Sequence, residues 1–103
     1  IKAIGKLEPF GIGNPEPLFL FKSVRIASKR LLGSNLDHLK LKLDDPETSK
    51  LENISTDAIA FKKGKLDKSL GVGDTVDIIA HLSLNTWNGI TTPQLIVKEI
   101  ILN

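Results

Sequence analysis

The chain has 103 residues, the length of one ordinary domain, and a formal net charge of +2, so its total charge indicates no particular class of partner. It contains no cysteine, which excludes disulfide bonds and thiolate zinc sites, and no apolar run reaches the roughly 18 residues that span a bilayer. Both absences fit a cytoplasmic protein without a membrane partner. The chain also lacks methionine, even at residue 1, so we expect it to be a piece of a longer protein.

The segment LEPFGIGNPEPLF near the start of the chain contains two closely spaced glycines, Gly11 and Gly13. A dinucleotide-binding loop would require a third glycine where this chain has Glu16, and the prolines on both sides of Glu16 exclude a helix there. A linker or a piece of fixed architecture remains, because glycines permit backbone angles that other residues resist and prolines hold the chain extended.

Two strands and a turn are expected next. Residues 19–27 are rich in aromatic and β-branched side chains, and Gly33-Ser34-Asn35 indicates a turn. Residues 38–44 alternate strictly, which predicts a half-buried strand. Its inner face would carry Leu39, Leu41 and Leu43, and its outer face His38, Lys40 and Lys42.

A polar stretch that contains a proline predicts a loop over residues 44–55, and a third strand is expected over 56–62. We predict that its two bulkier side chains, Ile59 and Phe61, face one way. The outer face would then carry Ala58, Ala60 and Lys62.

The last third of the chain predicts one or two helical turns over residues 64–71, with Gly71 as their C-terminal stop, and then a hairpin. The first hairpin strand is expected over 75–84, with one apolar face made of Val76, Ile78, Ala80, Leu82 and Leu84. A turn over 85–89 ends in Asn-Gly, and the final strand is expected over 94–102. Either face of that strand must carry a charge, which predicts a bulge or a barrel corner.

This order of elements predicts an all-β fold with one short helix, namely a five-stranded Greek-key OB-fold barrel over residues 19–103. An SH3-like barrel is the alternative, but the helix between the third and fourth strands favours the OB-fold. OB-folds bind ligands on strands 2 and 3 and on the loops that join strands 1–2 and 4–5. The candidate nucleic-acid-binding residues at those positions are Lys29, Arg30, His38, Lys40, Lys42, Lys62, Lys63, Trp87 and Asn88.

The roles expected for these residues follow from the chemistry of single strands, which need cations for phosphates and flat rings for bases. The lysines and Arg30 would contact phosphates, Trp87 and His38 would stack on bases, and Asn88 would form a hydrogen bond. The alternatives are a structural Trp87 packed over the barrel end and an ordinary exposed His38. The four phenylalanines are expected in the core or in an interface: Phe10, Phe19, Phe21 and Phe61.

No catalytic site and no metal site are expected. His38 and His81 are the only histidines, and neither has metal-type spacing to another ligand. Asp77, His81 and Ser83 lie along one strand, which spreads them over about 20 Å and excludes a triad. The pair Asp44-Asp45 before a proline is interpreted as solvated turn chemistry.

Three stretches resemble the OB-fold domain of RecJ, the bacterial single-strand-specific exonuclease: LEPFGIGNPEP, then HLKL at 38–41, then the hairpin from Asp77 through TWNG to Pro93-Gln94-Leu95. The resemblance implies a parent enzyme that degrades single-stranded DNA from the 5′ end in recombination and repair. It also implies Mn or Mg held by an Asp-His-His phosphoesterase core. Only Asp37-His38 is similar to that motif here, so no cofactor is expected in this fragment. By the same resemblance, residues 1–18 are an inter-domain connector that holds the LEPFGIGNPEP segment in a fixed conformation. Phe10 is then expected to be more exposed in this chain than in the longer protein.

The leading hypothesis is therefore a non-enzymatic, single-stranded-DNA-binding OB domain of a RecJ-like 5′–3′ exonuclease. Its partners would be single-stranded DNA and the remaining domains of the parent. The alternative is a structural module that clamps the catalytic domains or docks a single-strand-binding protein. A third hypothesis, a free-standing enzyme, is supported only by the chain length and by a fold that does not itself exclude catalysis.

Overall fold

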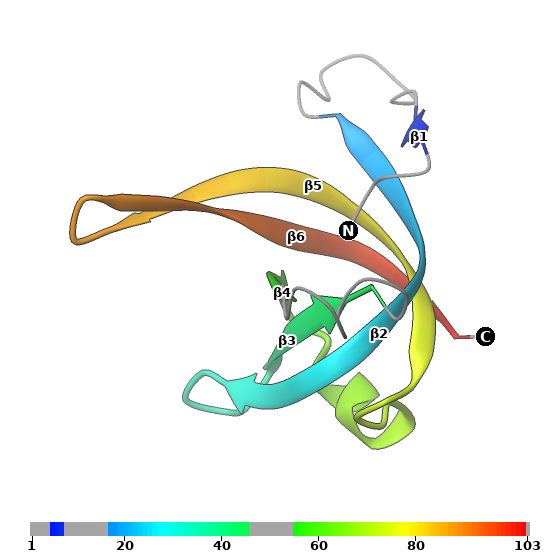
Figure 1. The fold of residues 1–103 in the computed structure, drawn as a ribbon. Helices are drawn as coiled ribbons and strands as arrows, with labels where there is room; N and C mark the ends of the chain where they lie inside the picture. The colour runs from blue at the N-terminus through cyan, green and yellow to red at the C-terminus, as the bar shows by residue number, and fades with distance from the viewer. Residues whose placement is uncertain (1–4, 8–16, 46–54, 103) are drawn as a thin grey trace, which may run out of the picture.

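The strands of the computed structural model, which describes residues 5–7, 17–45 and 55–102, form one strongly curved sheet (Figure 1). Their order is β1–β2–β3–β4–β6–β5, and β2 pairs with β5 as well, so five of these six strands close into a barrel. The strands are β1 (Gly5–Leu7), β2 (Leu18–Leu32), β3 (His38–Asp44), β4 (Ser55–Ala60), β5 (Thr75–Trp87) and β6 (Ile90–Leu102), with the 3₁₀ helix η1 (Gly64–Ser69) between β4 and β5. The barrel is therefore the predicted OB-fold, with the helix at the predicted place.

Strand β2 is longer than predicted because two bulges bend it so that it pairs with two different strands of the barrel. Its first half pairs with β5 and its second half with β3. At the first bulge Ser23 has a φ of +56°, and its N–H donates to Asp77 Oδ1 at 2.9 Å. At the second bulge Ala27 is the extra residue between two paired positions of β2. Bulges bend a strand and increase its twist, so the polar residues after Ala27 continue the strand instead of ending it.

The core lies between the inner faces of the five barrel strands. Leu39, Leu41 and Leu43 have no exposed surface, as the alternation of β3 predicted. The prediction for β4 was wrong, because Ala58 and Ala60 are fully buried while Ile59 is only partly so. The strand pairing explains why the alanines face inward. Leu39 lies directly opposite Ala60, and Leu41 opposite Ala58, so the alanines share the inner face with the core leucines of β3. The interior of a small barrel is filled by alternating large and small side chains, so alanine suits these positions.

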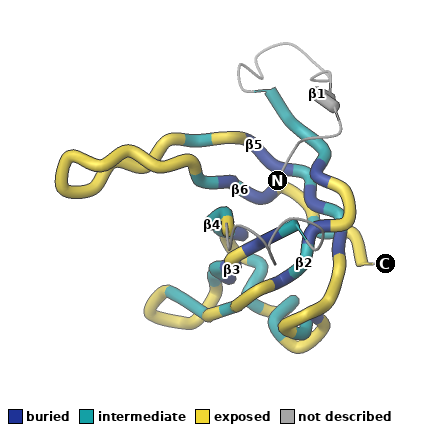
Figure 2. The backbone as a smooth tube through the Cα atoms, viewed as in Figure 1, coloured by how far each residue is buried: buried dark blue, intermediate teal, exposed yellow. Residues whose placement is uncertain are grey.

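The β5–β6 hairpin extends beyond the barrel as an arm, which is exposed along most of its length in Figure 2. Its turn is the predicted Asn88-Gly89, with φ of +50° and +78°, the signs that a two-residue type I′ turn requires. The predicted apolar face of β5 is buried only at its first three positions, whereas Leu82 and Leu84 are exposed. They lie past the end of the barrel, where no opposite wall of described residues covers them. The expected bulge in β6 is present at Lys98.

The predicted helix is a 3₁₀ segment, and its stop differs from the prediction. Leu70 follows η1 in an extended conformation and is buried in the core. Gly71 is not the left-handed stop; its N–H donates to Asp74 Oδ2 at 2.8 Å, and the glycine with positive φ is Gly73, at +96°. The short loop after η1 is therefore an Asp-centred turn instead of a glycine cap.

Part of the predicted connector is described. Strand β1 pairs antiparallel with the start of β2, and the carbonyl oxygen of Pro17 accepts a hydrogen bond from His81 Nδ1 at 3.0 Å. Phe10 and most of the LEPFGIGNPEP segment lie outside the described residues, as does most of the predicted loop over 44–55. Among the residues described, none of the helical structure is long and apolar enough to cross a membrane.

Candidate nucleic-acid interface

The outer face of the sheet can be followed across four strands through the register of paired residues. One row runs from Lys40 on β3 through Ile59 on β4 and Ile96 on β6 to His81 on β5. Paired residues in neighbouring strands project to the same side, so these side chains share one surface. The face of β3 and β4 is the one with which OB-folds bind ligands.

A second row lies beside the first and is more polar. It runs from Lys42 on β3 through Asp57 on β4 and Gln94 on β6 to Ser83 on β5. In these two rows the outer face is therefore basic on β3 and carries one apolar and one acidic side chain on β4. Neither row places a lysine or an arginine on β6 or β5.

Cations are concentrated where β2 meets β3. Arg30 lies directly opposite Lys40, and Ser28 lies opposite Lys42. These side chains line a groove of about 480 Å³. No ion pair joins Arg30, Lys40 or Lys42 to a described acidic residue. Like charges directly across a strand pair repel each other, so an anion in this groove would relieve a cost that the free domain carries.

Lys29 also contributes to the wall of that groove, but its ammonium group is engaged elsewhere. Its register partner is Leu41, a core residue, so Lys29 projects toward the inner side of the sheet. Its Nζ lies 3.2 Å from Asp67 Oδ1 and donates to the Asp67 backbone oxygen at 2.7 Å. Lys29 therefore ties β2 to η1, and its ammonium group points away from the outward-facing charges of Arg30, Lys40 and Lys42.

His38 and Lys62 meet at the start of β3, beside the turn that follows β4. The Lys62 N–H donates to His38 Nδ1 at 3.0 Å, and Lys62 has a φ of +59° because the chain turns sharply after β4. Lys62 was predicted within the third strand, but β4 ends at Ala60. Lys63 follows as the residue before η1.

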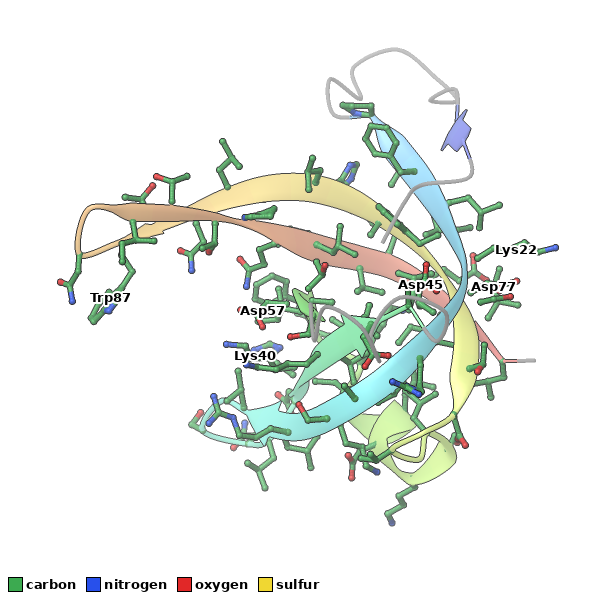
Figure 3. The ribbon with its side chains drawn as sticks, in the orientation of Figure 1. Lys22, Lys40, Asp45, Asp57, Asp77 and Trp87 are labelled. Atoms are coloured by element: carbon green, nitrogen blue, oxygen red, sulfur yellow. The ribbon has the colours of Figure 1, made fainter. Side chains whose placement is uncertain are left out.

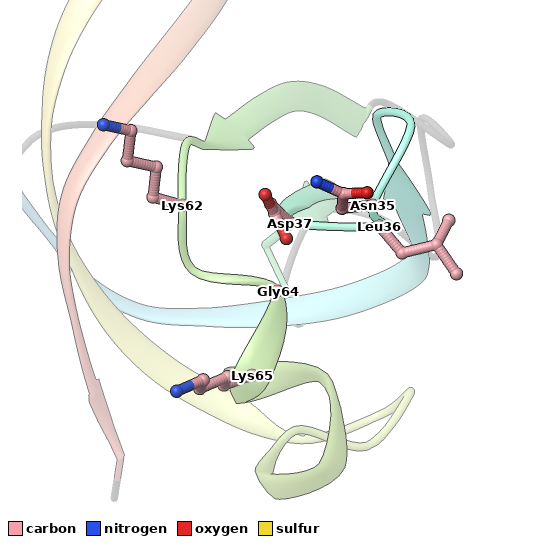
Figure 4. A pocket seen from close by; sticks show the side chains of 6 residues that line it. All are labelled: Asn35, Leu36, Asp37, Lys62, Gly64 and Lys65. Carbon is pink, nitrogen blue, oxygen red and sulfur yellow. The ribbon is translucent and has the colours of Figure 1, made fainter.

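A second depression of about 440 Å³ lies beside this turn (Figure 4). Lys62 and Lys65 extend to the same side of it, and Asp37 lies between them in the view. The Gly64 N–H donates to the backbone carbonyl oxygen of Asp37 at 2.7 Å, which joins the β2–β3 loop to the turn after β4, while the Asp37 side chain remains beside the depression. The carboxylate makes this depression less favourable for phosphate than the groove over β2 and β3.

Trp87 and Asn88 lie at the tip of the arm, away from the barrel wall. Trp87 is 75% exposed, so the alternative of an indole packed over the barrel end is wrong. Trp87 is six residues from His81 along β5 with no register shift between them, so it projects to the same outer face as Lys40. Figure 3 shows Trp87 and Lys40 on the same side of the hairpin.

Two outer-face residues, Ile59 and Phe61, were not among the predicted site residues. Phe61 was expected in the core or in an interface. It lies outside the core, 51% exposed, and edge-on to the His38 ring, with ring centroids 5.3 Å apart. The strict alternation of β3 contains the signal that could have placed Ile59 and Phe61 on the outer face. Pairing its leucines with the small residues of the next strand would have turned Ile59 and Phe61 outward.

A partly buried ion pair links two strands of the barrel and is not part of the groove over β2 and β3. Arg25 donates from Nε and Nη2 to the two carboxylate oxygens of Asp44, at 2.9 and 3.0 Å, which joins β2 to β3. This hydrogen bonding raises the pKa of Arg25, because Asp44 favours the charged guanidinium. Asp44 is largely buried, so the predicted solvated turn is wrong for this residue. Within the described part of the chain, no three acidic or histidine side chains are grouped as a metal site would require.

The comparison with known proteins agrees with this architecture. The family described as the RecJ OB domain matches residues 1–99. The chain is also similar to the single-stranded-DNA-specific exonuclease RecJ of Bacillus subtilis (strain 168), with 31% identity over 99 residues, which cover 96% of this chain and 12% of that protein. The chain therefore spans a small part of its relative, and the match extends over the predicted connector and the barrel alike. By fold and by sequence, the chain belongs to the RecJ OB-domain family.

Proposed function

We propose that this domain binds single-stranded DNA on the outer face of β3 and β4 and positions the strand for the catalytic core of a RecJ-like 5′–3′ exonuclease. The domain itself would not cleave DNA, and the divalent metal of the parent, Mn or Mg, would be held outside it. The similar Bacillus protein is named for its specificity for single-stranded DNA, which supports this choice of ligand.

The observation that carries the proposal is the like-charged pair Arg30 and Lys40, with Lys42 beside it in the same groove. A phosphodiester backbone supplies negative charges in a row, and such a row can bridge cations on neighbouring strands. Trp87 adds an exposed ring on the same sheet face. Cations beside an exposed ring are the combination that single-strand binders use.

The proposal is tested by titrating the chain with oligo-dT at several salt concentrations while following the fluorescence of Trp87, the only tryptophan. We expect quenching whose affinity falls with salt, with a slope of about −0.7 per phosphate contacted. The double variant Lys40→Ala/Lys42→Ala should bind more weakly and lose about 1.4 from the magnitude of that slope.

A matched control removes the same number of charges elsewhere. Lys22 and Lys68 are both exposed, and Lys22 projects from the side of the barrel opposite Trp87 in Figure 3. Lys22→Ala/Lys68→Ala should leave the slope almost unchanged. Equal losses in the two double variants would show that binding follows total charge and not this groove. No binding at low salt, checked with a labelled oligonucleotide, would contradict the proposal.

Two further parts of the proposal concern the parent protein. Residues 1–18 would connect the barrel to the preceding domain, and β1 would continue the sheet at that junction. The remaining domains of the exonuclease would be the stable partners of this barrel. If the chain binds a single-strand-binding protein but no oligonucleotide, its function is to dock that protein and not to bind DNA.

A further inference from the structure

Phe61 is unusual among the aromatic residues of the described barrel because its ring lies on the outer surface. It is 51% exposed, whereas Phe19 and Phe21 pack in or against the core. Phe61 follows Ala60 directly, and Ala60 pairs with Leu39, so Phe61 projects beside His38 on the outer face. Phe61 therefore presents a large ring on the same outer face as the cationic groove and does not belong to the core.

The His38 ring that supports Phe61 is fixed from two other directions. Its Nδ1 accepts the Lys62 N–H at 3.0 Å, which leaves Nε2 to carry the hydrogen of the neutral ring. On another side lies Gly33, where an added Cβ would come within 3.0 Å of His38 Cδ2. The ring planes of His38 and Phe61 meet at 75°, a T-shaped contact. His38 is therefore partly buried and held in place, while Phe61 keeps open surface.

The surroundings of Phe61 separate apolar from charged groups. Ile59 and Ile96 form a partly buried apolar strip along β4 and β6, and Lys40 with Arg30 forms the cationic strip along β3 and β2. A single strand has the same division, with flat apolar bases on one side and charged phosphates on the other. Phosphates over β2 and β3 would place bases over β4 and β6, where Phe61 lies.

We propose that Phe61, supported edge-on by His38, is a nucleobase-stacking subsite that receives one base of a single strand whose phosphates follow Arg30 and Lys40. This inference rests on the proposed function, and it assigns the stacking ring of the barrel wall to Phe61, with His38 as a positioning residue. The ligand class is an unpaired nucleobase, of any sequence, because every base has a flat face.

The test compares a strand that has bases with one that lacks them. Phe61→Leu keeps the bulk of the side chain and removes the ring. It should weaken binding of oligo-dT about 5- to 150-fold, the range for loss of one stacking contact, and leave binding of an abasic oligonucleotide of equal length unchanged. Phe61→Trp should bind oligo-dT at least as well as the unchanged chain. Val72→Ala alters another exposed apolar residue, beyond η1, and should change neither affinity.

Each possible result decides the question. Equal weakening on both oligonucleotides would show that Phe61 only shapes the loop, and unchanged binding on both would show that it makes no contact; either overturns the subsite. If Phe61→Leu unfolds, Phe61→Trp in a Trp87→Phe background gives a single reporter at the subsite. Its fluorescence must then be quenched by oligo-dT and not by the abasic strand. If the unchanged chain binds no strand, the proposed function fails as well, whereas binding without a loss in Phe61→Leu overturns the subsite alone.

Discussion

At the scale of single residues, Gly64 shows how closely two loops approach to build the site. A Cβ at this position would lie 2.4 Å from the Leu36 carbonyl oxygen and 2.9 Å from the Asp37 carbonyl carbon, both of them backbone atoms. Backbone cannot move aside as a side chain can, so Gly64→Ala should separate the β2–β3 loop from the turn after β4. We expect a loss of about 1–3 kcal/mol in the free energy of unfolding, measured in urea.

Gly71→Ala is the control for that measurement. Its added Cβ would come within 3.2 Å of Asp74 Oδ2, a side-chain atom, and Gly71 does not require positive φ. The loss should be clearly smaller than for Gly64→Ala. If both variants lose the same free energy of unfolding, the close approach at Gly64 is not what determines the effect.

Single residues also show what the sequence could and could not reveal about the site. The alternation of β3 placed His38, Lys40 and Lys42 on the outer face correctly, because a half-buried strand leaves no other phase. The engagement of Lys29 with Asp67 depends on where η1 packs against β2, which no local pattern determines. Phe61 was misplaced because a phenylalanine is usually a core residue, and only its partner strand shows that it faces outward.

At the scale of elements, β5 combines a buried half and an exposed half within one uninterrupted alternation. Ile78 is fully buried in the barrel, and Leu84 is 69% exposed in the arm. Ile78→Ala should lower the free energy of unfolding by about 2–5 kcal/mol, since it opens a cavity in the core. Leu84→Ala should change it by less than about 0.5 kcal/mol. Urea denaturation of both variants measures the difference.

The sequence pattern would predict similar losses for these two substitutions, because both residues belong to the same predicted apolar face. If Ile78→Ala and Leu84→Ala lose similar free energies of unfolding, then Leu84 must be covered in solution, for example by a second copy of the chain. Gel filtration would detect such a dimer. Alternation shows which side of a strand is apolar but not how far the opposite wall of a barrel reaches. The end of the barrel is a property of closure, and it could not be predicted from β5 alone.

At the scale of the whole molecule, the order of elements was enough to predict the topology. Five strands with a short helical segment between the third and fourth fit the OB-fold plan, and the closed order β2–β3–β4–β6–β5 confirms it. The bulges were only partly predictable. The bulge in β6 was expected from its ambiguous phase, whereas those in β2 arise because one strand must pair with two partners on different sides of the barrel.

The division of the molecule into a closed barrel and a projecting arm predicts two levels of local stability. Amides of the arm, such as those of Thr86 and Thr91, lie in a two-stranded ribbon without buried side chains, so local opening there should cost little free energy. Amides at Val76, Ile78 and Ala80 lie in the buried half and should exchange only through global unfolding. Hydrogen exchange followed by NMR should therefore show fast exchange in the arm and slow exchange in the barrel.

Repeating the exchange measurement with oligo-dT would relate this division to binding. If the strand lies over the cationic groove and reaches Trp87, exchange should slow in the arm and around β3 together, because one ligand would join two parts that otherwise open separately. Slowing around β3 alone would restrict the interface to the barrel wall and leave the arm free for contact with other domains of the parent. Slow exchange in the arm of the free chain, with gel filtration showing a monomer, would contradict the two-level picture itself, because no described residue outside the ribbon covers it.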